Sequence, residues 1–356
     1  MGSVLECLPQ GSRVAVLRLR SLGDCVLTTP ALDILRRGRP DLRLAVVVED
    51  RFRALFEENP DVDDILPPDI GVLRRWRPRL CLNLHGGSRS AWMTALSGAE
   101  HRAGFGHFRH QWAYNARIPR AQEILGEERT VHTAEHLASA MFWLGAPRGE
   151  IPRAKLYVPA SGNGAAPEGE IPRVKLAGRA PSPDLSVRLP EQRRQPPAER
   201  QRGDGGDAGP VGRPSPQRAA YAVIHPVAAT AEKTWRADGF LAVAEELREL
   251  GMEPVFIGAA AGDLTPFRAF RTVEGAPLAE IKALLAGASL FVGNDSGPAH
   301  MAAACGLPVV VLFGDSHPAI WGPWRTASEV VAAPGGMARI ATAQVLDALA
   351  RLRVHA

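Results

Sequence analysis

Short apolar runs alternate with helix-like segments on both sides of a polar middle stretch, and this alternation limits the possible folds more than any other feature. In the first half, residues 14–19 (VAVLRL) and 42–49 (LRLAVVVE) have the length and composition of buried strands. In the second half, residues 221–226 (YAVIHP) and 307–314 (LPVVVLFG) repeat the pattern. Buried strands that alternate with helices predict an open, mainly parallel α/β sheet in each half.

The middle of the chain, residues 149–219, is rich in Pro, Gly, Arg and Gln and has no helix or strand periodicity. It contains two near copies of one octapeptide, GEIPRAKL and GEIPRVKL, which are too short to form a solenoid. We therefore expect a Rossmann-like domain over residues 1–148 and another over 220–356. Between them we expect a mostly disordered, low-complexity insertion or linker over 149–219.

Composition narrows the class of protein. A chain of 356 residues with 46% hydrophobic residues is long enough for two globular cores. The four cysteines are scattered without a Cys-x-x-Cys spacing, which predicts a reduced cytoplasmic protein without a metal site. The sequence has neither an apolar run long enough to span a membrane nor a secretory leader pattern. The net charge of +4 arises mostly in the low-complexity stretch, so it predicts no nucleic-acid partner.

The stretch FVGNDSGPAH, residues 291–300, places small and polar residues between an apparent strand and an apparent helix. A helix that starts at Gly297 would have free N–H groups and a positive end, which suit a diphosphate. Ser296 would add a hydroxyl donor, and His300 would share its helix face. The alternative is that Asp295 or Ser296 only caps the helix and that His300 only packs.

Lys233 lies in a loop after the strand that ends at His225 and Pro226. The chain has only four lysines among 42 basic residues, so a lysine here is unusual for this sequence. A flexible ammonium can follow negative charge as it develops on a leaving phosphate, and Thr230 in the same loop can donate a hydroxyl. The alternative is an ordinary surface lysine.

Asp24, in the segment SLGDCVLTTPAL, follows the first predicted strand. A carboxylate on this loop would face the edge of the sheet where ligands bind, and it could accept a proton as a general base. The alternative is that Asp24 caps the helix that follows.

Three segments in this order resemble glycosyltransferase family 9, the lipopolysaccharide heptosyltransferases: RLRSLGDCVLTTPAL, HPVAATAEKTW and FVGNDSGPAHMAAACGLPVVVLFGDSHPAIWGPW. The resemblance covers most of residues 13–145 and 220–353. It implies a GT-B fold, in which two Rossmann-like domains face a central cleft. Residues 1–148 would bind the acceptor and residues 220–356 the nucleotide-sugar donor. The family is inverting and metal-independent, and it transfers heptose from ADP-heptose to the Kdo or heptose of the lipopolysaccharide inner core.

The resemblance also implies roles for individual residues. Asp24 would be the general base, and Lys233 would assist the leaving ADP. The residues expected to bind the donor and its phosphates are Thr230, Lys233, Asp295, Ser296, Gly297 and His300. The residues expected to contact the acceptor are Arg20, Ser21, Gly23, Ser88 and Arg89. No cofactor or metal is expected. This sequence departs from the family pattern at Val227, where Gly is usual, and at Asn83, where Asp is frequent.

The sequence is also compatible with two other functions. One is another GT-B sugar-nucleotide enzyme, either with a different donor or acceptor or an epimerase. The other is a catalytically silent relative that only binds a nucleotide sugar. A Rossmann dehydrogenase is disfavoured because no Gly-x-Gly-x-x-Gly follows the first strand. His132 and His136 have a spacing that can hold zinc, but no third ligand accompanies them, so packing is the preferred interpretation.

The resemblance predicts a cytoplasmic, monomeric enzyme that is peripheral at the cytoplasmic face of the inner membrane, because its acceptor is a lipid-linked saccharide. The basic segment RRWRPR, residues 74–79, is a candidate for contact with lipid headgroups. The alternative for this segment is a solvated turn.

Overall fold

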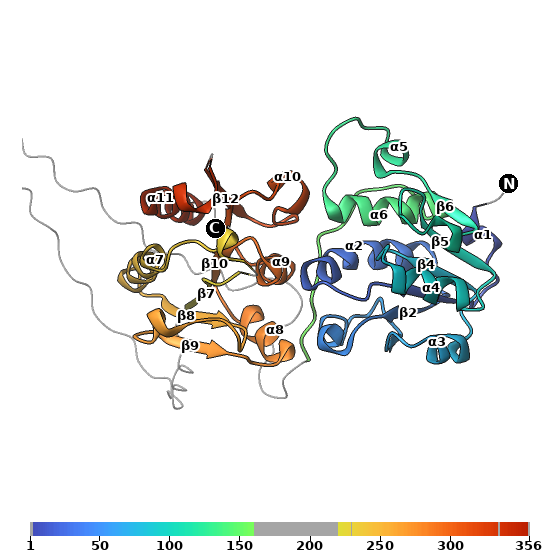
Figure 1. Cartoon of the computed structure of the whole chain (residues 1–356), viewed down its shortest axis with the longest axis horizontal. Helices are drawn as coiled ribbons and strands as arrows, with labels where there is room; N and C mark the ends of the chain where they lie inside the picture. Colours follow the sequence, from blue (N-terminus) through green and yellow to red (C-terminus); the bar gives the residue numbers. More distant parts are fainter. Residues whose placement is uncertain (1–2, 160–219, 229, 334, 355–356) are drawn as a thin grey trace, which may run out of the picture.

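The computed structural model describes residues 3–159, 220–228, 230–333 and 335–354. The first half forms a parallel sheet of β1 (Arg13–Leu17), β2 (Arg43–Val47), β3 (Asp64–Leu66), β4 (Leu80–Asn83), β5 (His101–Phe105) and β6 (Ala116–Ile118). The second half forms a parallel sheet of β7 (Tyr221–His225), β8 (Glu253–Gly258), β9 (Arg271–Glu274), β10 (Leu290–Asn294), β11 (Val309–Phe313) and β12 (Ser328–Ala332). The predicted pair of α/β units is thus confirmed (Figure 1).

The two sheets have the same strand order. The first runs β3-β2-β1-β4-β5-β6, and the second runs β9-β8-β7-β10-β11-β12 when it is read from its opposite edge. Each is therefore a 3-2-1-4-5-6 sheet, whose order reverses between its first and fourth strands. In parallel sheets of this kind, ligands bind beyond the carboxyl ends of the strands at that reversal.

The helices of the first half are α1 (Val4–Cys7), α2 (Leu22–Gly38), α3 (Ile70–Trp76), α4 (Ser88–Leu96), α5 (Ala121–Leu125) and α6 (Thr133–Leu144). Those of the second half are α7 (Ala237–Glu249), α8 (Leu278–Ala286), α9 (Gly297–Ala304), α10 (Pro318–Trp321) and α11 (Thr342–Val354). Helix α6 ends at Gly145, which has the left-handed conformation at φ 116°. Between β2 and β3 the chain forms the 3-10 helix η1 (Asp50–Leu55).

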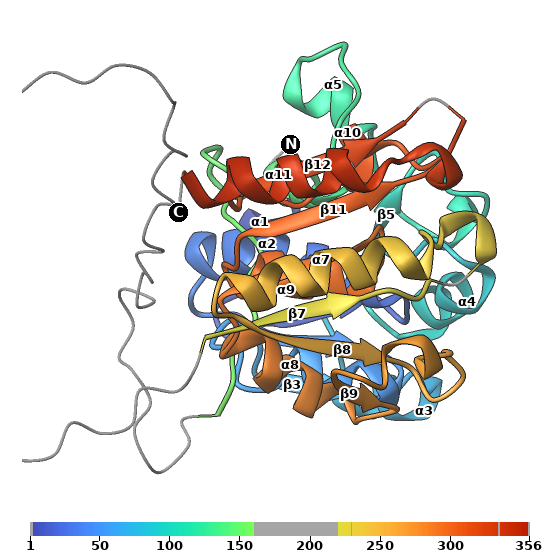
Figure 2. The same cartoon turned by 90° about the vertical axis from the view of Figure 1, so that its left-hand side faces the viewer.

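Four helices lie between the two sheets. Figure 1 shows α2 and α6 of the first unit facing α8 and α9 of the second. Figure 2 shows α7 and α11 on the other face of the second sheet, turned away from the first unit. One apolar core runs through the interface, since Val26 and Leu35 of α2 belong to the same buried cluster as Ala299 and Met301 of α9.

Polar contacts also join the units at several points. The buried ammonium of Lys282 on α8 donates to the backbone oxygens of Ala54 and Glu57, at 2.6 and 3.3 Å. On the other side of the interface, Nε2 of His132 lies 2.9 Å from the carbonyl oxygen of Gly322, and the His132 ring stacks on Trp324.

Residues 149–159 are packed at this interface, although the sequence predicts a disordered insertion from residue 149 onward. Ile151 and Ala154 are buried, and the carbonyl of Pro152 accepts a hydrogen bond of 2.8 Å from the indole of Trp324. Arg325 forms an ion pair with Glu150. The rest of the predicted insertion, residues 160–219, lies outside the described residues. Among the described helices, none is both long and apolar enough to cross a membrane.

The first turns of α2 and α9 pack tightly against each other, and this packing requires glycine on both helices. A Cβ at position 23 would lie 2.7 Å from Cδ2 of His300, and a Cβ at position 297 would lie 2.4 Å from Cδ2 of Leu22. Both distances are shorter than carbon atoms tolerate, so a larger residue at either position would force the helices apart.

Gly297→Ala is therefore expected to lower the free energy of unfolding by about 1–3 kcal/mol, the usual cost of overpacking. Chemical denaturation monitored by circular dichroism measures this change. Gly149→Ala is the matched control, because nothing lies within 4 Å of a Cβ at that exposed position. Equal stability of the two variants would contradict the steric role of Gly297.

Candidate functional site

The predicted site residues occupy the strand ends where the order of each sheet reverses. In the first unit, residues 20–24 follow β1, and Ser88 and Arg89 follow β4. In the second unit, Thr230 and Lys233 follow β7, and residues 295–300 follow β10. Because α2 packs on α9, the structure brings the residues after β1 beside those after β10.

Asp24 lies in the first turn of α2, where a carboxylate is favoured by the positive end of the helix. Ser21, and not Asp24, occupies the N-cap position, so the sequence-based alternative of Asp24 as the cap is wrong. The Ser21 hydroxyl donates a hydrogen bond of 2.9 Å to Oδ2 of Asp24. The Asp24 side chain is 24% exposed, so it remains accessible to a ligand.

Arg18 lies behind Asp24 and is almost completely buried, with 6% of its side chain exposed. Its Nη1 lies 3.8 Å from Oδ2 of Asp24, and its Nε has no hydrogen-bond partner among the described residues. Burial lowers the pKa of Arg18, and the negative charge of Asp24 raises it in the opposite direction. A guanidinium retains its proton under such conditions, so Asp24 has a fixed positive charge beside it.

Arg20 is exposed at the same strand end. His85 lies nearby and was not predicted as a site residue from the sequence. Burial lowers the pKa of His85, and the charges of Arg18 and Arg20 lower it further. Nδ1 of His85 is buried without a hydrogen-bond partner among the described residues. His85 immediately precedes the Gly-Gly pair of this loop, and that position was its only signal in the sequence.

Ser88 and Arg89 begin α4 on the same edge of the first sheet. The hydroxyl of Ser88 lies 2.8 Å from Nε2 of His110. Arg89 donates to the carbonyl of Pro68 at 2.7 Å and keeps 60% of its side chain exposed. The structure thus places both predicted acceptor residues at the rim of the first unit.

The start of α9 has unpaired donors. Ser296 occupies the N-cap position, but its side chain forms no capping hydrogen bond. The backbone N–H groups of Ser296 and Gly297 have no acceptor in the described part of the chain. Free N–H groups at the positive end of a helix form an anion-binding site. The arrangement therefore favours the interpretation of this turn as a phosphate site.

The side chain of Ser296 turns to the neighbouring strand instead of its own helix. Its Oγ lies 3.0 Å from Nδ1 of His225, the last residue of β7. Burial lowers the pKa of His225 to about 4, so its ring is neutral at pH 7. This contact joins the ends of β7 and β10, the two neighbouring strands between which the strand order of the second sheet reverses.

Lys233 and Asp295 form an ion pair, with Nζ 3.7 Å from Oδ2. The Lys233 side chain is 45% exposed, whereas that of Asp295 is 11% exposed. Thr230 is exposed, and its carbonyl accepts hydrogen bonds from the Lys233 N–H and the Thr234 hydroxyl. Lys233 is thus held near the start of α9 by a carboxylate, on a loop that is open to solvent.

Asn294, which was not predicted as a site residue from the sequence, organises this loop. Its fully buried side chain donates to the carbonyl of Pro226 at 2.9 Å and accepts from the N–H of Trp235 at 3.2 Å. These two bonds anchor both ends of the segment that carries Thr230 and Lys233. In the sequence, the signal for Asn294 is that it is a polar residue at the end of an otherwise apolar strand.

His300 is buried between α9 and the first turn of α2, in contact with Gly23. Burial lowers the pKa of His300 to about 4, while Asp295 and Asp24 raise it to a smaller degree. Its Nδ1 has no hydrogen-bond partner among the described residues. In this structure His300 contacts the first unit, and its predicted role in donor binding stays a prediction.

His132 and His136, which have a zinc-compatible spacing, are used in packing. The His136 ring stacks on Phe105 with 4.0 Å between centroids, and His132 contacts Gly322 across the interface. In the described ranges, no group of three or more His, Cys, Asp or Glu residues is placed to hold a metal ion.

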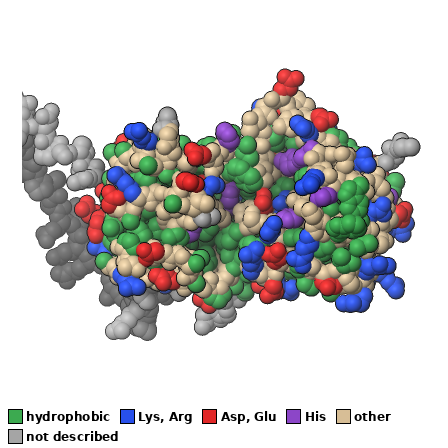
Figure 3. Space-filling model, viewed as in Figure 1, with side chains coloured by type: hydrophobic (Ala, Val, Ile, Leu, Met, Phe, Trp, Pro, Cys, Tyr) green, Lys and Arg blue, Asp and Glu red, His purple; other side chains and the backbone are tan. Residues whose placement is uncertain are grey.

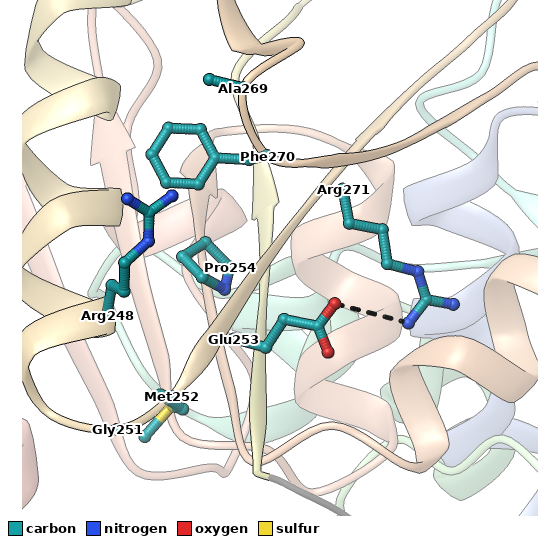
Figure 4. A pocket seen from close by; sticks show the side chains of 8 residues that line it. All are labelled: Arg248, Gly251, Met252, Glu253, Pro254, Ala269, Phe270 and Arg271. Atoms are coloured by element: carbon teal, nitrogen blue, oxygen red, sulfur yellow. Dashed lines mark ion pairs between the residues drawn. The ribbon is translucent and has the colours of Figure 1, made fainter.

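A hollow of about 370 Å³ lies at the opposite edge of the second sheet, near the amino ends of β8 and β9. Figure 4 shows Arg248 over the ring of Phe270, with Glu253 and Arg271 paired beside them. The predicted site residues do not line this hollow. It is therefore distinct from the site formed by α2 and α9.

Comparisons with known proteins agree with this geometry. The model of glycosyltransferase family 9 (heptosyltransferase) matches residues 174–342. Lipopolysaccharide heptosyltransferase 3 of Escherichia coli is 27% identical over 337 residues, which cover 86% of this chain and 84% of that protein. The protein of the same name from Escherichia coli strain K12 is 36% identical over 115 residues, a third of its length (33%) and 29% of this chain.

Solved structures establish the fold. A glycosyl transferase family 9 protein from Veillonella parvula has a TM-score of 0.73 at 19% identity, over 98% of both chains. The Escherichia coli heptosyltransferase WaaC, solved with ADP, has a TM-score of 0.67 at 17% identity, over 96% of this chain and 99% of that one. The predicted GT-B fold is thus confirmed. Together with the family model and the relative that spans most of both chains, it shows that this chain is similar to the heptosyltransferases of glycosyltransferase family 9.

Proposed function

We propose that this enzyme transfers a heptosyl group from ADP-heptose to a Kdo or heptose residue of the lipopolysaccharide inner core, with inversion and without a metal ion. The observation that carries the proposal is the contact of α2 with α9, which packs the helix turn that carries Asp24 against the helix turn that has the free N–H groups of Ser296 and Gly297. An acceptor hydroxyl that gives its proton to Asp24 can then attack the anomeric carbon of the heptose, while the bond from that carbon to the ADP phosphate at the start of α9 breaks. The names of the curated relatives support the heptosyl group and the lipopolysaccharide acceptor.

On the donor side, the diphosphate of ADP would lie at the start of α9. The Ser296 and Gly297 N–H groups would bind phosphate oxygens, and the helix end would favour their negative charge. Lys233 would leave Asp295 for the phosphate as the bond to the sugar breaks, and its exposed, flexible side chain supports such a movement. Asp295 would then face a sugar hydroxyl or the departing ammonium.

On the acceptor side, Asp24 would accept the proton of the attacking hydroxyl. The Ser21 hydroxyl and the guanidinium of Arg18 support this role, because their contacts hold the carboxylate of Asp24 in one position. Arg20, Ser88 and Arg89 would contact anionic groups of the acceptor from the rim. We further propose that the enzyme acts as a monomer at the cytoplasmic face of the inner membrane.

The substrate assignment is tested by incubating the full chain with a panel of nucleotide sugars and a Kdo-lipid A acceptor. Mass spectrometry of the product is expected to show one added heptose from ADP-heptose. Transfer from a different nucleotide sugar alone, with ADP-heptose inert, would refute the assignment.

Asp24→Asn is expected to lower kcat by about 10²–10⁴-fold, because the amide cannot accept the acceptor proton. ADP binding, measured by calorimetry, should be retained since the phosphate site lies on the other unit. Asp33→Asn is the matched control: Asp33 lies on the same helix, and its carboxylate pairs with Arg37 and Lys155 away from the site. Unchanged transfer by Asp24→Asn would remove Asp24 as the base.

Lys233→Met is expected to lower kcat by about 10²–10³-fold and to weaken ADP binding, because it removes the charge that stabilises the leaving phosphate. Thermal stability should change little, since the lysine is half exposed. Lys155→Met, which removes another half-exposed lysine paired with an aspartate, provides the control. Steady-state kinetics in which the two variants match would contradict the proposed role.

Stability is expected to fall as the pH falls from about 6.5 to 4. The pKa values of His136, His225 and His300 are each lowered by burial to about 4, below the value of an unfolded histidine. Between these pH values the unfolded chain binds more protons than the folded chain, so acid favours unfolding.

His225→Asn should reduce this pH dependence, because His225 is one of the buried histidines whose lowered pKa contributes to it. Denaturation midpoints measured across this pH range check the slope. The control is His101→Asn at the start of β5, outside the buried group. A slope that stays the same in His225→Asn would contradict the assignment.

A further inference from the structure

Two tryptophans and a leucine form an exposed apolar surface on the first unit. Trp92 on α4 is 55% exposed, Trp112 on the 3-10 helix η2 (Gln111–Ala113) is 50% exposed, and Leu96 is 43% exposed. The two indoles contact each other edge to face, with 4.8 Å between ring centroids. Leu96 follows Trp92 by one helical turn and shares its face of α4. We call Trp92, Leu96 and Trp112 the tryptophan surface.

The tryptophan surface is built on a firm support. Ala91, Ala113 and Tyr114 form a buried cluster beneath it, and Phe108 packs against that cluster. The indole N–H groups of Trp92 and Trp112 donate to no group in the described residues, whereas those of Trp76, Trp235 and Trp324 each have an acceptor. The exposed rings thus retain both an apolar face and a free donor, which is the combination favoured at the boundary between lipid and water.

Exposed arginines adjoin the tryptophan surface. Arg74, Arg75 and Arg77 are exposed on and after α3, which packs against α4, and Arg109 is exposed just before η2. None of these four has a carboxylate partner in the described part of the chain. Figure 3 shows hydrophobic side chains over the region of α4 beside Lys and Arg side chains over the region of α3. The local charge is therefore complementary to an anionic surface.

The sequence had pointed to the basic segment at residues 74–79 as a whole, but its tryptophan is not available to lipid. Trp76 is half-buried, its indole donates to Asp64 at 3.1 Å, and the guanidinium of Arg13 lies over its ring. The arginines of that segment remain exposed, and the aromatic contact comes from Trp92 and Trp112 instead. The pairing of these exposed arginines with the exposed rings of Trp92 and Trp112 depends on the fold and could not be predicted from the sequence of residues 74–79.

We propose that the tryptophan surface, with its flanking arginines, docks this enzyme on an anionic lipid bilayer. The proposal deepens the proposed function, because α4 begins at Ser88 and Arg89, two of the proposed acceptor contacts. Docking through the exposed face of α4 would hold a lipid-linked acceptor near the end of the helix that leads to the site. A bilayer fits better than a protein, since three side chains are far fewer than the 20–30 residues that a stable protein interface uses on each side.

The test is co-sedimentation of the full chain with vesicles of phosphatidylethanolamine and phosphatidylglycerol, compared with vesicles of phosphatidylcholine. The wild type should bind the anionic vesicles, and added salt should weaken this binding. Brominated lipids should quench part of its tryptophan fluorescence. The double variant Trp92→Ser/Trp112→Ser should bind at least about tenfold more weakly and lose that quenching. Arg74→Gln/Arg75→Gln should bind more weakly and depend less on salt.

The control variant is Val330→Ser, which removes a 40% exposed apolar side chain from the second unit and should bind vesicles as the wild type does. Circular dichroism should show that the tryptophan variant remains folded, since both rings are half exposed. Vesicle binding that is unchanged in the tryptophan variant would overturn the proposal. A wild type that binds no vesicles but forms a dimer lost in the variant would also overturn it, and would assign the surface to a second copy of the chain.

Failure of docking and failure of the proposed function are separated by two acceptors. Transfer to a deacylated, soluble acceptor should be equal in wild type and tryptophan variant, whereas transfer to the acylated acceptor in vesicles should fall in the variant. If no heptose is transferred to either acceptor while vesicle binding still depends on the tryptophans, the proposed function fails and the docking surface stands. Equal transfer to the vesicle-bound acceptor would overturn a role of docking in the reaction.

Discussion

The packing of the first turn of α2 against the first turn of α9 is the contact on which the site depends. Gly23 of α2 contacts the ring of His300, and Gly297 of α9 contacts the side chain of Leu22, so each helix has a glycine where the other presents a side chain. This close approach sets the carboxylate of Asp24 and the free N–H groups of α9 at the same interface. The candidate site residues belong to two separate sheets. The contact between α2 and α9 therefore fixes where the residues of one sheet lie relative to those of the other.

Each sheet fixes its functional loops with a buried asparagine at the end of its fourth strand. In the first sheet, Asn83 accepts from the N–H groups of His85 and Gly86, at 3.0 Å each, and donates to Tyr114. In the second, Asn294 binds both ends of the loop that carries Lys233. Burial makes these bonds strong and the loss of a partner costly, so the loops are held in one conformation at the strand ends where ligands bind.

The sequence predicted the central strands and the loops that follow them, because fully buried parallel strands such as β1, β10 and β11 are continuous apolar runs. It did not predict edge strands such as β3 and β9, whose side chains are only partly buried and so lack that pattern. It also missed Asn294, whose partners are 59 and 68 residues away along the chain. Residues 149–159 were assigned to a disordered insertion because their composition is that of a linker, while their order comes from contacts with Trp324 and Arg325.

Burial distinguishes the two ion pairs of the site more than distance does. Arg18 and Asp24 are 3.8 Å apart and Lys233 and Asp295 are 3.7 Å apart, yet the arginine side chain is 6% exposed and the lysine side chain 45%. A buried guanidinium cannot follow a substrate, so its charge acts continuously on the neighbouring carboxylate. A half-exposed ammonium on four rotatable bonds exchanges a weak, solvent-screened partner for a phosphate at little cost. The first pair therefore suits a carboxylate that must stay in place, and the second suits a charge that can move toward a ligand.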